Sequence, residues 1–505
     1  KLKSSPFKKS KKIKLASKKE IQSMLGVCIK NLDEITEIRH DISSKFLPDA
    51  KETCANWLSN NQPLPLREYY HSFQITSCTN DDKVIKKNEI WAVVNGLFRG
   101  VKNKLLLQAE KALLHKSNVL PWAGAAIQVD ENGVPVSQSG SWHTFLPLFK
   151  SNHPVALHGW FELNDTRTTI IYNGTDDKSE VLKHWNELLL EHAVGVAWAL
   201  LIDLIKSKNN MKIDYKFWAK QVDDSPLDSI LESYLIKGFY AKTSELQCFY
   251  TIHQLKSQWQ SPLENTLYFL KDDKNNILSD AFRENFNLIS PKPQGFIVKN
   301  FKDINIKIIE ITPEYVRNHL KLKTEAVTYP SSFKTIPVEY LSKKEWLLEI
   351  LNFCADNGED YNKLEGLPLE LTLDSKIYKI GVDTFFDDNP NLNLFLYKKY
   401  LFLDSDLVNS IEKDVVTLPL SWVMPTLINQ ITLLNLYIKE DEITKEWLGE
   451  VIELIISSKD DNFIEAKEEI IKLNIVYQES ETYATLKSDI ANFSPFIPRD
   501  EDIEN

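Results

Sequence analysis

The longest helical pattern in this sequence carries four side chains that could bind a metal ion. His184, Glu187, Glu191 and His192 recur at offsets of zero, three, seven and eight residues, which places them on one face of an α-helix. Imidazole and carboxylate groups on a shared helix face can hold zinc. The leucines and the alanine between them leave little polar face, so surface or capping contacts of the two glutamates are the favoured interpretation. We therefore predict no metal site.

A second candidate is Arg167, which follows the turn Asn164-Asp165-Thr166 between two predicted strands. A long cationic side chain can project from such a rigid edge, and the planar fork of a guanidinium group suits phosphate oxygens. The alternative is a surface arginine that pairs with Asp165 or Asp176 and contributes little. No Ser/His/Asp or Cys/His signature is recognisable among the ten histidines and five cysteines.

Charge and composition narrow the class of protein. The chain has 505 residues and a net charge of −11, yet nine of its first nineteen residues are lysine. This arm, residues 1–19, is interpreted as a solvated linker, with a nucleic-acid contact as the alternative. No apolar run approaches about 18 residues, so no membrane span is expected. The scattered cysteines form no CxxC pair, which favours a reducing, cytoplasmic location. The start at a lysine and the lack of a signal peptide suggest a piece of a longer polypeptide.

The order of elements predicts an α+β, multidomain fold. Short strands are expected at 89–98, 124–129, 143–148, 155–163 and 168–172, interrupted by a helix around 102–115. A long helix over about 179–205 should cover this mixed or antiparallel sheet. These elements form a domain over 20–210, which begins with helices at 19–60.

The remainder is predicted to be a mixed α/β linker domain over 211–342 and a repeat-like region over 343–505. Strands are expected at FIVKNF (296–301) and INIKIIEI (304–311), and a helix opens at Thr312-Pro313-Glu314. An amphipathic helix at 343–357 precedes strands within 364–380 and 394–404, and the last hundred residues are expected to be helical.

Several phrases of this sequence resemble the sacsin-like proteins, which are related to Hsp90. They are HGWFEL with a following arginine, WNELLL within 153–206, LPWAGAAIQV at 120–129 and FLPL at 145–148. Residues 345–405 also resemble sacsin repeats, in which a helix leads into a G-L-P-L strand and a hairpin. The family glycine of that hairpin is replaced here by Ser375, so its turn is expected to differ. In this family the first block follows an Hsp90-type (GHKL) ATP-binding module.

The resemblance implies where nucleotide would bind. The ATP site of this superfamily combines Glu-x-x-x-Asn, Asp-x-Gly-x-Gly and a glycine-rich lid. Glu314 and Asn318 match the first spacing, and Asp356 with Gly358 matches part of the second, but Asp360 replaces the second glycine and no lid follows. There is no Walker A sequence. We interpret these matches as chance, so ATP and magnesium would be bound by a preceding module rather than by this chain.

The resemblance also implies a function. The family places an arginine where Arg167 lies, and in Hsp90-like ATPases a basic residue of the following domain reaches the γ-phosphate. The chain would then be the post-ATPase portion that couples nucleotide-driven closure to a client or partner protein, in a chaperone-like role or in microbial antiphage defence. The alternative is a non-enzymatic scaffold or nucleic-acid-associated protein that uses Lys1–Lys19. Most of the tryptophans between 91 and 218 are expected in the core, with an exposed subset free to bind peptide.

Overall fold

The structure is a computed structural model that describes most of residues 66–385 and parts of the chain beyond them. The short gaps within that range are 79–83, 118, 137–139, 145, 210–213, 223–226, 272–275 and 382–383. Beyond it, residues 401–411, 418–423 and short pieces between 429 and 484 are described. The lysine-rich arm, the helices expected at 19–60 and most of the last hundred residues lie outside the described residues.

The chain divides into two compact units. The first contains residues up to Phe269 together with Asn287–Glu310, and the second contains Leu270–Phe286 and the residues from Ile311 onward. This division is coarser than the four-part organisation expected from the sequence. It assigns residues 211–269 and 287–310 to the same unit as the first sheet.

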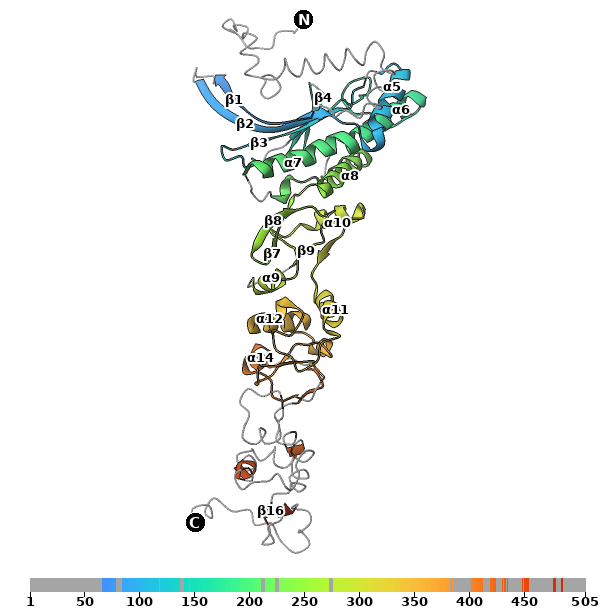
Figure 1. Ribbon diagram of the computed structural model, residues 1–505. Helices are drawn as coiled ribbons and strands as arrows, with labels where there is room; N and C mark the ends of the chain where they lie inside the picture. Colours follow the sequence, from blue (N-terminus) through green and yellow to red (C-terminus); the bar gives the residue numbers. More distant parts are fainter. Residues whose placement is uncertain are drawn as a thin grey trace. The chain divides into compact units, whose positions relative to one another are not determined.

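The first unit is built on a six-stranded sheet in the order β1-β2-β3-β6-β4-β5 (Figure 1). Its strands are β1 (Leu66–Cys78), β2 (Val84–Leu97), β3 (Trp122–Val129), β4 (Gly140–Thr144), β5 (Leu146–Ser151) and β6 (Ala156–Gly159). All neighbours are antiparallel except β4 and β6, which run parallel. The mixed sheet and its helices confirm the α+β class. Strand β1 and the first residues of β2 were missed by the sequence prediction.

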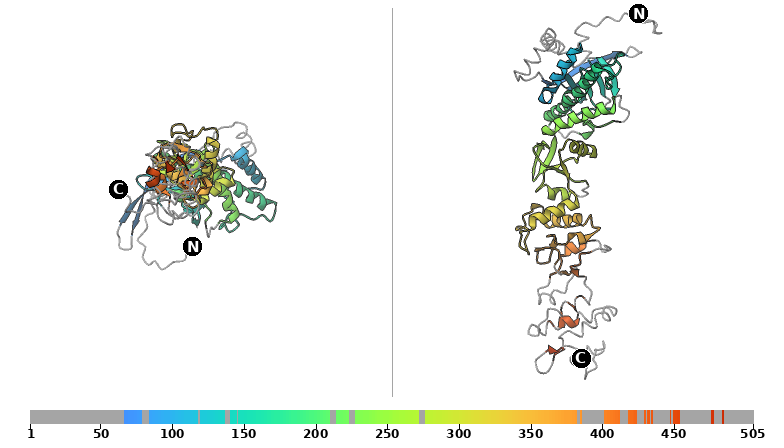
Figure 2. Two further views of the ribbon diagram at one scale, coloured as in Figure 1. Left: turned by 90° about the horizontal axis from the view of Figure 1, so that it is seen from below. Right: turned by 90° about the vertical axis from the view of Figure 1, so that its right-hand side faces the viewer.

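Helices cover one face of this sheet. Helix α5 (Lys104–Leu114) precedes strand β3 in the sequence. After β6, the chain forms α6 (Asp177–Leu189), a π-helical turn (Leu190–Val194) and α7 (Gly195–Asn209), and these three segments are continuous as one long helix. The views in Figures 1 and 2 show α7 lying across β2 and β3, with α8 (Ser229–Glu245) packed on its other side. The long covering helix predicted from periodicity is confirmed, but the π-helical turn within it was not foreseen.

Two glycines allow the long helix and α8 to approach closely. A Cβ atom added to Gly238 would lie 1.9 Å from the carbonyl oxygen of Glu191, which belongs to the π-helical turn. A Cβ atom added to Gly195 would lie 2.5 Å from the carbonyl oxygen of Leu235. Any side chain at either position would therefore force the two helices apart.

The stretch Asp177–Ser207 is the only helix among the described residues that is long and apolar enough to cross a membrane. However, 72% of its most apolar window is buried inside the protein. Trp185, Trp198 and Leu201 are fully buried and belong to the hydrophobic core. This burial is typical of the core helix of a soluble protein.

A second, five-stranded sheet shares the core of the first unit. Its order is β11-β9-β10-β7-β8, from β7 (Phe249–His253), β8 (Lys256–Gln260), β9 (Leu267–Phe269), β10 (Leu288–Ile289) and β11 (Ile308–Glu310). Aromatic rings connect it to the helices: Trp218 packs on Phe239 of α8 at 5.7 Å between ring centroids and on Phe249 of β7 at 5.2 Å. Such edge-on and tilted ring contacts stabilise beyond the buried area alone.

One predicted strand of this region is a helix. Residues 296–301 were expected to be extended, but they lie in α10 (Gly295–Asp303). Ile297 and Phe301 are four residues apart and both fully buried, so a single helix face supplies both side chains to the core. Tertiary packing overrides the strand preference of β-branched and aromatic residues here.

The second unit begins with helices packed through aromatic side chains. These helices are α9 (Ile277–Phe282), α11 (Pro313–Thr324) and α12 (Lys344–Cys354). Thr312 begins α11 as predicted, because its hydroxyl accepts a hydrogen bond from the Tyr315 N–H at 3.1 Å. Phe282 packs on Tyr340 at 5.4 Å and on Phe353 at 5.9 Å.

Short strand pairs follow α12. They are β12 (Glu370–Leu371) with β13 (Ile377–Tyr378), β14 (Thr384–Phe385) with β15 (Trp422–Val423), and β16 (Val476–Tyr477) with β17 (Tyr483–Ala484). Helix α14 (Ser405–Ser410) lies between them in sequence. In the β12–β13 hairpin Ser375 has a φ of 60°, the left-handed conformation that glycine adopts without strain. The serine therefore occupies a glycine-type position of the turn.

Candidate functional site: the Arg167 turn on helix α6

Arg167 lies in a tightly hydrogen-bonded turn between Leu163 and Ile170, which pair as an isolated β-bridge. The carboxamide oxygen of Asn164 accepts hydrogen bonds from the N–H groups of Thr168 at 2.9 Å and Thr169 at 3.2 Å. The Arg167 N–H donates to the Asn164 carbonyl oxygen at 2.8 Å. An asparagine that closes a loop in this way fixes its backbone. The sequence predicted the turn correctly, although the flanking segments form a bridge rather than full strands.

The backbone of Arg167 is strained and its side chain is free. Its φ is 55°, a left-handed conformation that costs an L-residue other than glycine about 1 kcal/mol or more. The side chain is exposed, and among the described residues it forms no ion pair, including with Asp165 or Asp176. A cation on a rigid turn without an internal partner is available to an external anion.

Helix α6 holds the base of this turn. The indole N–H of Trp185 donates to the Trp160 carbonyl oxygen at 2.9 Å. The next residue, Asn186, is fully buried and bonds the backbone of Glu162 and Ile171. Trp185 and Asn186 are the first two residues of the WNELLL motif. Their contacts give that phrase a physical role, which is to fasten the segment 160–171 to α6.

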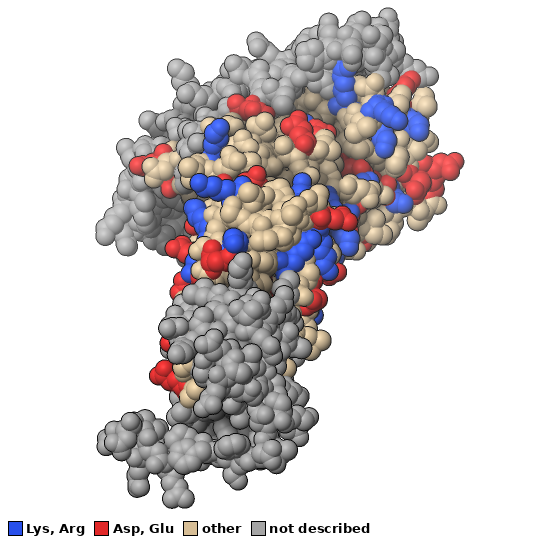
Figure 3. Space-filling view, turned by 60° about the horizontal axis from the view of Figure 1, so that its bottom comes forward, with Lys and Arg blue, Asp and Glu red and all other residues tan. Residues whose placement is uncertain are grey.

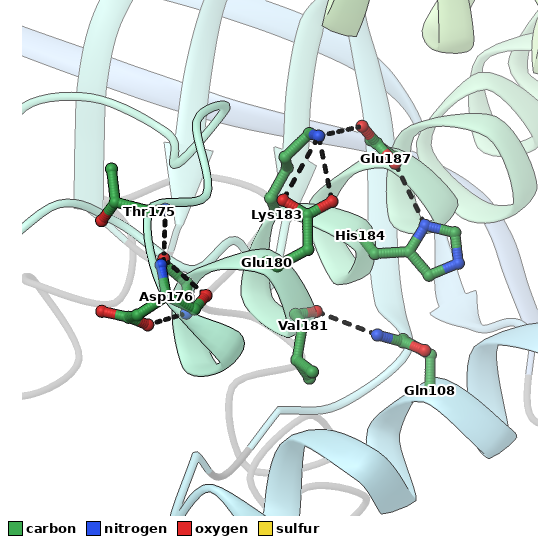
Figure 4. A network of polar contacts seen from close by, with 9 residues as sticks. Gln108, Thr175, Asp176, Glu180, Val181, Lys183, His184 and Glu187 are labelled. Atoms are coloured by element: carbon green, nitrogen blue, oxygen red, sulfur yellow. Dashed lines mark hydrogen bonds and ion pairs between the residues drawn. The ribbon is translucent and has the colours of Figure 1, made fainter.

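The start of α6 is fixed by a capping box immediately after the turn segment. The Asp176 carboxylate accepts a hydrogen bond from the Ser179 N–H at 2.7 Å, and the Ser179 hydroxyl accepts from the Asp176 N–H at 3.0 Å (Figure 4). The hydrogen bond from the Ser179 N–H is the main reason why the pKa of the Asp176 carboxyl lies below its ordinary value. One turn later, Gln108 of α5 donates from Nε2 to the Val181 carbonyl oxygen at 2.9 Å and ties α5 to α6.

The four side chains considered as metal ligands are not assembled into one site. His184 Nδ1 lies 3.1 Å from Glu187 Oε2 (Figure 4), whereas Glu191 pairs with Lys237 of α8 at 2.9 Å. His192 is buried, and that burial lowers the pKa of its imidazole. Glu191 and His192 lie within the π-helical turn, whereas His184 and Glu187 lie in α6, so the regular α-helical spacing assumed from the sequence does not hold across the four residues. Within the described part of the chain no group of three such residues could hold a metal ion.

The matches to an ATP site lie in the second unit, and one of them, Asp356, has a structural role. Arg317, inside the Glu314–Asn318 pattern, donates to the Cys354 carbonyl oxygen at 2.5 Å and to the Asp356 carboxylate at 2.9 Å. Lys363 forms a second ion pair with Asp356, and both cations lower the pKa of that carboxyl. Asp356 is therefore engaged in fastening α11 to the end of α12.

The tryptophans follow the sequence prediction for the core. Among those between positions 91 and 218, Trp122, Trp142, Trp185, Trp198 and Trp218 are buried. Trp91 and Trp160 are half-buried. On the face drawn in Figure 3, acidic and basic side chains of the described residues are interspersed, which gives no extended basic surface there.

Sequence reasoning missed two buried polar residues. Asn186 lies within an apolar helical run, and Glu370 lies within the apolar phrase LPLELTL. A polar residue at a core position of such a run is the available signal, because buried polar groups need hydrogen-bond partners.

No protein-family model, no curated protein and no solved structure matches this chain.

Proposed function

We propose that this chain is the post-ATPase segment of a sacsin-like, Hsp90-related ATPase. It couples nucleotide-driven closure of a preceding ATPase module or subunit to the binding of a client or partner protein in the cytoplasm. ATP and magnesium bind to that module rather than to this chain. The guanidinium group of Arg167 meets the terminal phosphate in the closed state and stabilises the charge that develops during transfer to water.

One observation supports this proposal above all others. Arg167 combines a strained left-handed backbone with an exposed side chain that has no ion pair among the described residues. Glycine or asparagine would suit such a turn better, since both adopt this conformation more readily. Strained residues that surrounding hydrogen bonds hold in place are concentrated at functional sites. An arginine at this position is thus better explained by its guanidinium than by its backbone.

The test uses the longer polypeptide or complex that includes the ATPase module. Arg167→Ala should lower the turnover number by about one to three orders of magnitude, as expected for loss of a phosphate-clamping arginine. Nucleotide affinity should change little, because the contact forms mainly in the closed state. Arg167→Lys should restore turnover only in part, since an ammonium group lacks the fork.

Lys116 supplies the matched control. It is also an exposed cation of the first unit with a left-handed backbone, at a φ of 62°. Lys116→Ala should leave turnover unchanged. Equal turnover of a well-folded Arg167→Ala protein and the wild type would contradict the proposal.

The location of the nucleotide site is tested on this chain alone. Calorimetric titration with ATP and magnesium should show no micromolar binding. Binding that is lost in Asn318→Ala would instead assign a nucleotide site to the second unit.

A further inference from the structure

Asn186 is a buried polar side chain that makes three hydrogen bonds beside the Arg167 turn. It lies in α6, and its side chain is completely buried. Its Oδ1 accepts a hydrogen bond from the Glu162 N–H at 2.9 Å. Its Nδ2 donates to the Glu162 carbonyl oxygen at 2.8 Å and to the Ile171 carbonyl oxygen at 3.0 Å. Both Nδ2 hydrogens and the carboxamide oxygen are thus used.

These three bonds reach both sides of the turn that carries Arg167. Glu162 precedes the turn and Ile171 follows it, and the Ile171 N–H also donates to the Glu162 carbonyl oxygen at 3.1 Å. One side chain of α6 therefore holds the two ends of the loop together and against the helix. Only a carboxamide offers an acceptor and two donors in a single planar group of this size.

We propose that Asn186 is a positioning residue for Arg167. This inference rests on the proposed function of the turn. It assigns to α6 the task of setting where the guanidinium lies when the ATPase module closes. A phosphate contact depends steeply on position, because a displacement of about 1 Å can lower a rate by about a hundredfold. Loss of the Asn186 hydrogen bonds would leave the guanidinium group of Arg167 intact but would allow the turn that carries it to move.

The proposal predicts a specific kinetic pattern. Asn186→Leu keeps the approximate volume but removes all three hydrogen bonds, and it should lower the turnover number by about ten- to a hundredfold. Nucleotide affinity should stay close to that of the wild type, since the side chain is completely buried and its hydrogen bonds are made within the protein. In the double variant Asn186→Leu/Arg167→Ala, turnover should be no lower than in Arg167→Ala alone, because both substitutions remove the same contact between Arg167 and the phosphate.

Gln108 provides the control for a general effect on α6. It is also a buried carboxamide, but the hydrogen bond that it donates goes to the Val181 carbonyl oxygen of that helix and not to the Arg167 turn (Figure 4). Gln108→Leu should leave turnover near the wild-type value. Hydrogen exchange of the present chain adds a readout that needs no ATPase module. Amides between 160 and 172 should exchange faster in Asn186→Leu and not in Gln108→Leu.

Each outcome separates this inference from the proposed function. If Asn186→Leu does not fold, Asn186→Asp replaces it, because aspartate keeps the acceptor for Glu162 and removes both donors. If Arg167→Ala lowers the turnover number and the Asn186 variants keep the wild-type turnover number, the positioning role is overturned and the proposed function stands. Additive losses in the double variant would also overturn it. Full activity of Arg167→Ala would remove the proposed function and the positioning role together.

Discussion

The close crossing of the long helix and α8 makes a quantitative prediction for Gly238→Ala. The added Cβ atom would lie 1.9 Å from the Glu191 carbonyl oxygen. An ordinary carbon–oxygen contact is about 3.2 to 3.6 Å, so the backbones must separate by more than about 1 Å at this point. The obstacle is backbone on both sides, which cannot rotate away as a flexible side chain could.

The expected magnitude follows from two opposed effects. Overpacking of a core costs about 1 to 3 kcal/mol, and contact with rigid backbone favours the upper end. Replacing a glycine by alanine within a helix contributes about 1 kcal/mol of stability in return. The free energy of unfolding of the first unit should therefore fall by about 2 kcal/mol.

Gly295 is the matched control, since a Cβ atom there would have nothing within 4 Å. Gly295→Ala, at the start of α10 in the same unit, should be neutral or stabilising by up to about 1 kcal/mol. Urea unfolding of both variants, followed by tryptophan fluorescence of the buried core, gives the comparison. A Gly238→Ala protein as stable as the Gly295→Ala protein would refute the reasoning about the crossing.

Two further predictions concern the second unit. Ser375→Gly should stabilise the β12–β13 hairpin by about 1 kcal/mol, because it removes a left-handed serine; a lower urea midpoint than wild type would contradict this. Glu370 is fully buried and accepts hydrogen bonds from the Thr384 hydroxyl at 2.6 Å and the Trp422 indole at 3.0 Å, and burial raises its pKa from 4.5 to about 7. Because its folded-state pKa exceeds the unfolded one, its contribution to stability is complete below pH 4.5 and is lost as pH rises to about 7, a change of about 3 kcal/mol. Glu370→Gln should therefore gain stability relative to wild type by about that amount between pH 4.5 and 8, measured by denaturant unfolding; a constant difference across this range would contradict the assignment.

Long periodic segments could be predicted from the sequence, and local departures from regularity could not. The long helix was predicted because its apolar residues recur at helical spacing over about 179–205, which is roughly seven turns. The π-helical turn at Leu190–Val194 was not, because the residue spacing does not reveal the tertiary contact beside it, where Gly238 of α8 meets Glu191. The error at α10 has a similar cause. Ile297 and Phe301, its two buried residues, are four positions apart and would share a face in a strand as well as in a helix, so their spacing does not decide between the two.

In the candidate site, too, some features could be predicted from the sequence and others could not. The turn at Asn164 and the exposed cation that follows it could be predicted from residue types alone. The three bonds of Asn186 could not, since they join α6 to residues 15 and 24 positions away in the sequence. The left-handed backbone of Arg167 was also missed, although the hydrogen bonds that hold it lie within the turn itself. The metal hypothesis for His184 and its neighbours assumed unbroken α-helical spacing, which the π-helical turn removes.

The most direct test of the central claim is the turnover number and the stability of Arg167→Gly, measured on the same preparation. Glycine relieves the left-handed strain, so the free energy of unfolding should stay equal or rise by about 1 kcal/mol. Turnover in the presence of the ATPase module should nevertheless fall by about one to three orders of magnitude, because the phosphate contact is lost. An Arg167→Gly protein that is as stable as wild type and hydrolyses ATP at the wild-type rate would contradict the account.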